Sequence, residues 1–218
     1  MFDRIAPRYD RLNRLLSFGA DRSWRRRAIA LSRLGPSERA LDVGAGTGDL
    51  SLGLLRASDP ASAVVGIDLA PRMLAISRRR ARGPYLPVVA NAEALPLPDA
   101  SVDRVVSAFT LRNIGGLPRA LREMRRVLRH GGRAVLLELS HPPNATFRRV
   151  YLFYFERILP VLAALLGGEP AAYRYLPRSL APFPTAERLA EMLREAGFAD
   201  VRFERLTLGI AAIHVAQR

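Results

Sequence analysis

The chain contains no cysteine, and this absence removes several classes of protein at once. None of its 218 residues can form a disulfide scaffold, a thiolate-ligated zinc or iron–sulfur site, or a thiolate nucleophile. Only three histidines are present, so a multi-histidine metal site is not expected and we predict no resident metal. Hydrophobic residues make up 49% of the chain, which at this length predicts one domain around a buried core.

Lysine is also absent, so all 34 basic residues are arginine and the net charge is +14. One interpretation is a genome rich in G and C, which writes arginine codons in place of lysine codons. The other is attraction to anionic partners such as nucleic acid, lipid headgroups or anionic substrates. The arginines are spread over many segments, and no Asn-Pro-Pro or Asp-Pro-Pro signature of nucleic-acid amino-methylation occurs. We therefore expect no nucleic-acid partner.

Long apolar runs are lacking too. The longest stretch, from Val150 to Gly168, is interrupted by Glu156, Arg157 and Pro160, and it does not read as a membrane span. No N-terminal apolar core with a small-residue cleavage site is evident. We expect a cytoplasmic protein.

The middle of the chain alternates short β-like runs with helical patterns, which is typical of an α/β fold with a parallel sheet. The predicted strands are Arg39–Val43, Ala63–Ile67, Val88–Ala90, Arg104–Ser107 and the apolar Arg133–Leu139. The predicted helices are Leu50–Ala57, Met73–Arg82 and Leu117–Leu128, the last stopped by Gly131-Gly132. At the end of the chain, helix Ala186–Gly197 precedes strands Val201–Leu206 and Ile210–Ala216, whose tight connection predicts an antiparallel hairpin.

Two regions lie outside this alternation and are expected to cap the sheet. The single domain therefore divides into an N-terminal helical cap (1–35), a cofactor-binding core (36–140), a second helical cap (141–185), and a C-terminal helix with hairpin (186–218). The aromatic run Tyr151–Phe155 in the second cap is predicted to pack in the core, or to contact an apolar ligand tail or a membrane interface.

The first predicted strand runs directly into Gly44-Ala45-Gly46-Thr47-Gly48 and then a helix. Glycines suit this position because the turn is tight and a ligand must approach the backbone closely. A dinucleotide fingerprint would need glycine at position 49, where this chain has Asp49. Since a carboxylate at a helix N-terminus would repel a pyrophosphate, the loop favours a nucleoside cofactor without phosphates. As an alternative, Asp49 is simply a favourable first-turn acid.

Acidic and amide residues follow the next two strands. Asp68 ends the second strand, where an acid can accept hydrogen bonds from both ribose hydroxyls. Asn91 and Ala92 follow the third strand and could meet the adenine edge, whereas Asp42 either contacts the cofactor or braces the loop. Together these features predict S-adenosylmethionine bound by Asp42, Gly44, Gly46, Thr47, Gly48, Asp68, Asn91 and Ala92.

Several further segments make the chain resemble the ubiquinone/menaquinone biosynthesis C-methyltransferase family. They are FDRIAPRYDRLNRLLSFGADRSWRRR (2–27), LDVGAGTGD (41–49), NAEALPLPDASVD (91–103), FTLRNI (109–114), YRYL (173–176) with Ser179, and FP (183–184). The resemblance implies a Rossmann-like class I methyltransferase with a seven-stranded, mostly parallel sheet, a terminal antiparallel hairpin and a helical cap. It also implies that Thr47, Asp68, Asn91 and Ala92 line the cofactor site. Relatives often have serine before the phenylalanine of FTLRN, and here Ala108 stands there, with Ser107 beside it.

The implied reaction places a methyl group on a ring carbon of a prenylated quinol. Arg112 and Asn113 follow the fourth strand, where a guanidinium could lower the quinol pKa and an amide could bond a ring oxygen. Alternatively, Arg112 pairs with a carboxylate such as Glu138 and Asn113 caps a turn. Tyr9 is a candidate for closing over the reactants, or a packing residue, and His141 is a candidate base.

We expect a demethylmenaquinol methyltransferase at the inner face of the membrane, with peripheral contact aided by positive charge. The naphthoquinol is preferred to the benzoquinol because the chain lacks the longer leader and insertions associated with ubiquinone-pathway relatives. A methyltransferase for a sterol, another phenol or a soluble acceptor is the alternative, followed by a basic RNA-binding protein on a methyltransferase scaffold. The terminal hairpin offers an edge for a homodimer.

Overall fold

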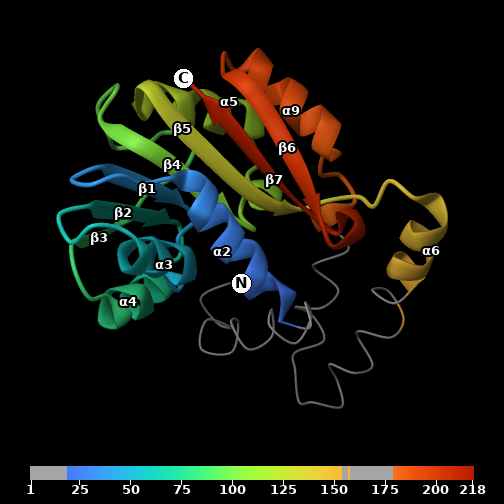
Figure 1. The fold of residues 1–218 in the computed structure, drawn as a ribbon, viewed down its shortest axis with the longest axis horizontal. Coiled ribbons are helices and arrows are strands. Elements are labelled where there is room, and N and C mark those ends of the chain that lie inside the picture. Colours follow the sequence, from blue (N-terminus) through green and yellow to red (C-terminus); the bar gives the residue numbers. More distant parts are fainter. Residues whose placement is uncertain (1–18, 154–156, 158–178) are drawn as a thin grey trace.

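A computed structural model gives the fold, and it describes residues 19–153, 157 and 179–218. The centre of the molecule is a seven-stranded sheet with the order β3-β2-β1-β4-β5-β7-β6 (Figure 1). Its strands are β1 (Arg39–Val43), β2 (Ala63–Asp68), β3 (Tyr85–Val89), β4 (Val102–Ala108), β5 (Leu128–Leu139), β6 (Ala199–Leu206) and β7 (Ala211–Gln217). Strands β1 to β5 pair in parallel, whereas β7 runs antiparallel to both β5 and β6. The predicted parallel sheet with a terminal antiparallel hairpin is confirmed.

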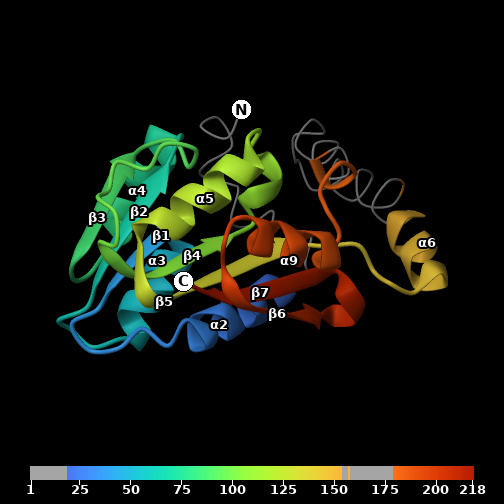
Figure 2. The same cartoon turned by 90° about the horizontal axis from the view of Figure 1, so that it is seen from above.

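Helices cover both faces of this sheet. They are α2 (Ala20–Ser32), α3 (Asp49–Ala57), α4 (Pro71–Arg80), α5 (Leu117–Val127) and α9 (Ala186–Glu195), with short 3₁₀ turns η1 (Leu111–Asn113) and η3 (Thr207–Gly209). Helix α6 (Ala145–Phe153) lies beyond the end of the sheet (Figure 1). Figure 2 shows α5 and α9 on one face and α2 on the other. Side chains of α5 and α9 join one apolar cluster with the sheet, and side chains of α2 and α3 join a second. The central strands are therefore buried on both sides, which explains their continuous apolar runs.

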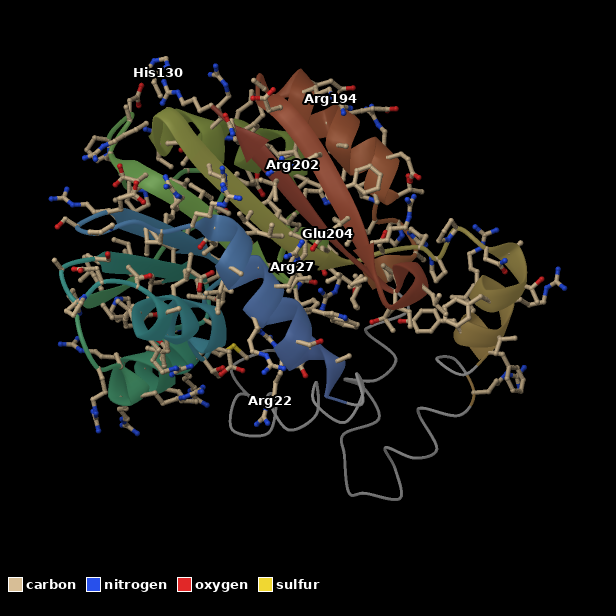
Figure 3. The ribbon with its side chains drawn as sticks, in the orientation of Figure 1. Arg22, Arg27, His130, Arg194, Arg202 and Glu204 are labelled. Atoms are coloured by element: carbon tan, nitrogen blue, oxygen red, sulfur yellow. The ribbon has the colours of Figure 1, made fainter. Side chains whose placement is uncertain are left out.

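Helix α2, in the described part of the N-terminal helical cap, covers one face of the sheet. Trp24 and Ala28 of α2 are buried against Val106 of β4 and Val135 of β5. Arg27 of α2 also points toward Glu204 of β6, and their ion pair has an Nε–Oε1 distance of 2.7 Å (Figure 3). The N-terminal helical cap expected over residues 1–35 thus includes a helix whose apolar stripe is buried against the sheet, and the boundary at residue 35 stays a prediction.

Most predicted boundaries differ from the structure by a few residues, and three of the differences have a clear physical reason. Strand β3 begins at Tyr85 rather than Val88 and contains Pro87, which an edge strand tolerates because one side needs no ladder donor. Helix α4 begins at Pro71 rather than Met73, since proline fits the first turn of a helix. Helix α5 ends at Val127, and the two glycines predicted to stop it lie inside β5.

Strand β5 is not fully apolar, because its Glu138 is a buried carboxylate. Strand β7 contains His214, which is buried. Its ring stacks on Phe203 at 5.2 Å between centroids, and burial lowers its pKa to about 4. Within the described ranges, no helix is long and apolar enough to cross a membrane.

Candidate active site

A cavity opens at the carboxyl ends of β1, β2, β3 and β4. Strands β2 and β3 lie on one side of β1, and β4 and β5 lie on its other side, so the strand order reverses beside β1. A ligand of an open α/β sheet usually binds at such a point. The cavity is lined by predicted cofactor residues from three strand ends, namely Asp42, Gly44, Gly46, Thr47, Asp68, Asn91 and Ala92. Gly48 is not among the lining residues; it begins the helix behind them.

Backbone hydrogen bonds fix the conformation of the glycine loop. The amides of Gly44 and Ala45 both donate to the carbonyl of Ile67, each at 2.8 Å, so the loop is tied to the end of β2. Gly44 and Gly48 have φ values of 77° and 89°, where any other residue would be strained. A methyl group at Gly44 would overlap Thr110, and one at Gly48 would lie 2.8 Å from Ser77 Cβ. The glycine loop therefore approaches Thr110 and Ser77 more closely than a side chain on the loop would permit.

Asp68 is oriented by the same loop. Its Oδ2 accepts a hydrogen bond from the Gly46 amide at 2.9 Å, and its Oδ1 accepts from the Ala70 amide at 2.8 Å. Two backbone donors fix the plane of the carboxylate while the residue lines the cavity. This is the geometry needed for a group that must receive two adjacent hydroxyls.

Asp42 lies deeper, with 1% of its surface exposed. Ser51 Oγ donates to its Oδ2 at 2.5 Å, whereas its Oδ1 is buried and accepts no hydrogen bond from the described residues. Burial raises the pKa of Asp42 to about 7, and the nearby Asp68 carboxylate adds to the rise, while the Ser51 hydrogen bond and Arg25 oppose it. A buried acceptor without a donor, facing a cavity, fits a cationic or hydrogen-bonding ligand.

The β3 side of the cavity is a compact turn. Asn91 Oδ1 accepts from the Glu93 amide at 2.9 Å, so the side-chain oxygen shapes the turn rather than pointing freely outward. Glu93 Oε1 in turn accepts from the Gly116 amide at 3.0 Å, which joins this turn to the segment before α5. Together with Ala92 these groups form the wall beyond Asp68.

Comparison with known proteins finds similarity over the full length of the chain. The model of the "ubiE/COQ5 methyltransferase family" matches residues 1–218. The chain belongs to this family. A demethylmenaquinone methyltransferase of Thermus thermophilus is 52% identical, with all of both chains aligned. The ubiquinone/menaquinone biosynthesis C-methyltransferase UbiE of Geobacter sulfurreducens is 44% identical over all of this chain and 87% of its own.

The ubiE/COQ5 fold is also shared with more distant methyltransferases. A solved S-adenosylmethionine-dependent methyltransferase of Thermotoga maritima superposes with a TM-score of 0.70, covering 99% of this chain and 97% of its own at 23% identity. At this identity the likeness shows the fold alone. It agrees with the Rossmann-like class I architecture expected from the sequence.

A residue of the turn after β4 forms a buried ion pair with a residue near the end of β5. Arg112 Nη1 contacts Glu138 Oε1, and the two side chains are 3% and 2% exposed. Arg112 also donates to the carbonyl of Phe109 at 2.9 Å, and Glu138 accepts from the Leu139 amide at 2.8 Å. The pairing with Glu138 is thus the alternative that the structure bears out. Arg112 is not among the residues that line the described cavity.

The other predicted catalytic residues fall in different places. Asn113 is exposed and lines the cavity beside Ile114. His141 does not line it, and its Nε2 lies 3.0 Å from the Phe183 carbonyl oxygen. Ser107 is buried, donates to the Val43 carbonyl at 2.7 Å and does not line the cavity, so it supplies no hydroxyl there. Tyr9 and the YRYL segment at 173–176 lie outside the described residues.

Several cavity residues were not predicted from the sequence, and two of them, Phe109 and Arg25, contact each other. Phe109 lines the cavity with a φ of 61°, a left-handed conformation that is unusual for an aromatic residue. Arg25 of α2 lines it as well, with its guanidinium 4.9 Å from the centre of the Phe109 ring. The available sequence signal was only the spacing of Asp21 and Arg25, four residues apart on a helix, which is common on surfaces.

Proposed function

We propose that this chain transfers a methyl group from S-adenosylmethionine to a ring carbon of a prenylated quinol, most simply demethylmenaquinol. The observation that carries the proposal is the 52% identity, over the full length of both chains, to a demethylmenaquinone methyltransferase. The cavity agrees with it, because its strand ends present the residues that a nucleoside cofactor needs.

The residues of the cavity fit this cofactor. When bound, S-adenosylmethionine supplies an electrophilic methyl group on a sulfonium centre. Asp68 would bind the ribose hydroxyls, Asn91 and Ala92 would lie along the adenine, and Gly44 to Thr47 would pass beneath the cofactor with little side-chain bulk. The unpartnered Oδ1 of Asp42 would receive positive charge or a donor from the amino-acid part.

On the acceptor side, the chain must hold a quinol ring in line and favour its deprotonated form. A ring carbon becomes nucleophilic when the neighbouring hydroxyl loses or shares its proton, so the oxidised quinone does not serve. Asn113 lines the cavity and would bond a ring oxygen. Arg112 is a positioning residue in this account, because it holds the Phe109 carbonyl at 2.9 Å from within the buried pair. Alignment of this kind contributes up to about 7–11 kcal/mol in favourable cases.

His141 and Tyr9 stay candidates for the proton acceptor and for closure over the reactants. If Nε2 of His141 is the protonated nitrogen that donates to the Phe183 carbonyl, Nδ1 is left as the basic atom. His141→Gln should then lower turnover without changing cofactor affinity.

The experiment uses methyl-labelled S-adenosylmethionine with demethylmenaquinol in detergent, scored by mass spectrometry. Ring-methylated product is expected with the chemically reduced quinol and not with the oxidised quinone. Asp68→Ala is the matched control: it should weaken cofactor binding by calorimetry while its circular dichroism stays that of the wild type. Cofactor binding without product from any quinol would overturn the acceptor and move the assignment to another phenol, a sterol or a soluble molecule.

A prenylated substrate resides in a membrane, and α6 offers a surface for peripheral contact. Val150 and Phe153 are 61% and 60% exposed and lie three residues apart, on one side of the helix. Exposed Arg148 and Arg149 precede them, and such a mixture of apolar and basic side chains suits an anionic lipid surface. Val150→Ser with Phe153→Ser should reduce co-flotation with anionic vesicles. Leu86→Ser, which removes an equally exposed side chain on β3, should not.

A homodimer through the hairpin stays a prediction. Strand β6 is at the edge of the sheet and carries Arg202, Glu204 and Arg205. Charged side chains on an edge oppose strand-to-strand pairing, so light scattering on a sizing column is expected to give a monomer unless another surface is used.

A further inference from the structure

The charges that line the cavity are unevenly distributed. Among the described residues, the lining contains four carboxylates, on Asp42, Asp49, Asp68 and Glu93, and one guanidinium, on Arg25. Asp49 pairs with Arg80 at 2.7 Å, Asp68 accepts two backbone amides, and Glu93 accepts the Gly116 amide. These three carboxylates thus accept hydrogen bonds within the protein, whereas Asp42 Oδ1 has no donor among the described residues.

Arg25 is held in place from two sides. Its Nη1 pairs with Asp21 Oδ2 at 2.5 Å one helical turn earlier, and its guanidinium lies over the Phe109 ring. Its side chain is 15% exposed. A guanidinium has five N–H donors in a planar fork, so the contact with Asp21 leaves donors for a second carboxylate. A basic side chain fixed on an aromatic ring at a cavity wall is suited to binding an anion.

The order of the strands indicates which anion this is. The ribose site is at the end of β2 and the adenine side is at β3, so an extended nucleoside places its remaining part over β1 and β4. At those strand ends lie Asp42, near the end of β1, and Phe109, directly after β4, with Arg25 of α2 over its ring. Arg25 is also close enough to Asp42 to lower that carboxyl's pKa. The cavity therefore ends in one buried carboxylate and one fixed guanidinium, opposite in charge to the two groups of an amino acid.

We propose that Arg25 binds the α-carboxylate of the methionine part of S-adenosylmethionine, opposite Asp42. The inference rests on the proposed cofactor and adds a binding residue supplied by α2, outside the glycine loop and the strand ends. Arg25 thereby couples the first described helix to the cofactor. Its contact with Phe109 links the same guanidinium to the segment that Arg112 holds on the acceptor side.

The test compares two arginines on one helix with two cofactors. Arg25→Gln removes the guanidinium, and Arg26→Gln removes a neighbouring exposed arginine as the control. Dissociation constants are measured by calorimetry for S-adenosylmethionine and for its decarboxylated form, which keeps the sulfonium and the amine. We expect Arg25→Gln to weaken S-adenosylmethionine about 10- to 100-fold, as for loss of a charge-assisted hydrogen bond, and to leave the decarboxylated form within about twofold. The control should bind both as the wild type does.

Two results would overturn the proposal. Equal loss for both ligands would mean that Arg25 acts only by packing on Phe109, and no loss for either would mean that the carboxylate is bound elsewhere. Failure of the wild-type protein to bind S-adenosylmethionine at all is a distinct outcome, because it removes the proposed function itself. An unchanged circular dichroism spectrum of Arg25→Gln excludes unfolding as the cause of any loss.

Discussion

The edge of the sheet that carries the cavity has a cofactor half, at the ends of β1, β2 and β3, and an acceptor half, at the ends of β4 and β5. Different forces stabilise the two halves. At the ends of β1, β2 and β3, backbone amides and glycines fix the geometry, and nearly all contacts join residues close to the strand ends. At the ends of β4 and β5, the buried ion pair between Arg112 and Glu138, 26 residues apart, holds the backbone through the Phe109 carbonyl. The cofactor half thus depends on conformations that only glycine adopts easily, whereas the acceptor half depends on charge in a dry environment.

Loss of Glu138 should break the acceptor half with the largest effect. Glu138→Ala removes the carboxylate that buried Arg112 contacts, and breaking a buried pair costs about 3–5 kcal/mol in unfolding free energy, as measured by urea denaturation. Replacing both residues with Met and Leu should recover much of that stability, but it should not restore turnover if the pair positions Phe109. Full turnover in the double variant would contradict the positioning role.

Within the cofactor half, alanine substitutions at two glycines distinguish the cost of backbone strain from the cost of steric overlap. Gly44→Ala combines a left-handed φ of 77° with overlap on Thr110, and should cost about 2–4 kcal/mol. Gly46→Ala has a φ of 53°, but its nearest other atom would be Met73 Sδ at 3.7 Å, so about 1–2 kcal/mol of backbone strain is expected. Equal losses in denaturation would show that Thr110 moves aside at no cost.

Cofactor affinity should depend on pH through Asp42. With its pKa near 7 in the free protein, the carboxyl must lose a proton to face a cationic cofactor, so affinity should rise about tenfold from pH 6 to pH 8. The unfolding free energy should move the other way, falling as pH rises from about 4 to 7, because in that window the folded state holds a proton that the unfolded state has lost. Asp42→Asn should flatten both profiles, and an unchanged slope would assign the titration to another group.

The smallest effect is expected outside both halves, at the Arg27–Glu204 pair. The side chain of Arg27 is 52% exposed, and exposed ion pairs contribute little because water and salt screen them. Arg27→Gln should therefore give a denaturation curve that overlays the wild type at physiological salt. A clear loss would mean that the link between α2 and β6 matters for docking the helix that carries Arg25.

The difference between the halves also explains what could be predicted from the sequence. The glycine loop, Asp68 and Asn91 are identified by short spacings after apolar strands, and the structure places them in one cavity. The pairing of Glu138 with Arg112 could be offered only as an alternative to a catalytic Arg112, because residues 26 apart in the sequence are brought together only by the fold. Arg25 was missed because it stands among many arginines, and only folding brings α2 onto Phe109.

The predicted start of β3 and the predicted stop after α5 were wrong for a similar reason. Pro87 reads locally as a strand breaker, and the position of β3 at the edge of the sheet, which makes the proline harmless, is a property of the whole fold. The glycines after α5 read as a helix stop, but β5 begins at Leu128 and pairs there with Val102. Pairing across the sheet decided both cases over local preference.

The contact between Gly44 and Thr110 has one more consequence, for motion. The Gly44 and Ala45 amides are tied to β2, the Phe109 amide donates to Leu137 of β5 at 2.9 Å, and Gly44 and Thr110 leave no space between them. The floor of the cavity is therefore one frame that cannot hinge between its cofactor and acceptor sides. Any opening or closing during turnover must come from segments above this frame, and ligands meet a floor that loses little conformational entropy when they bind.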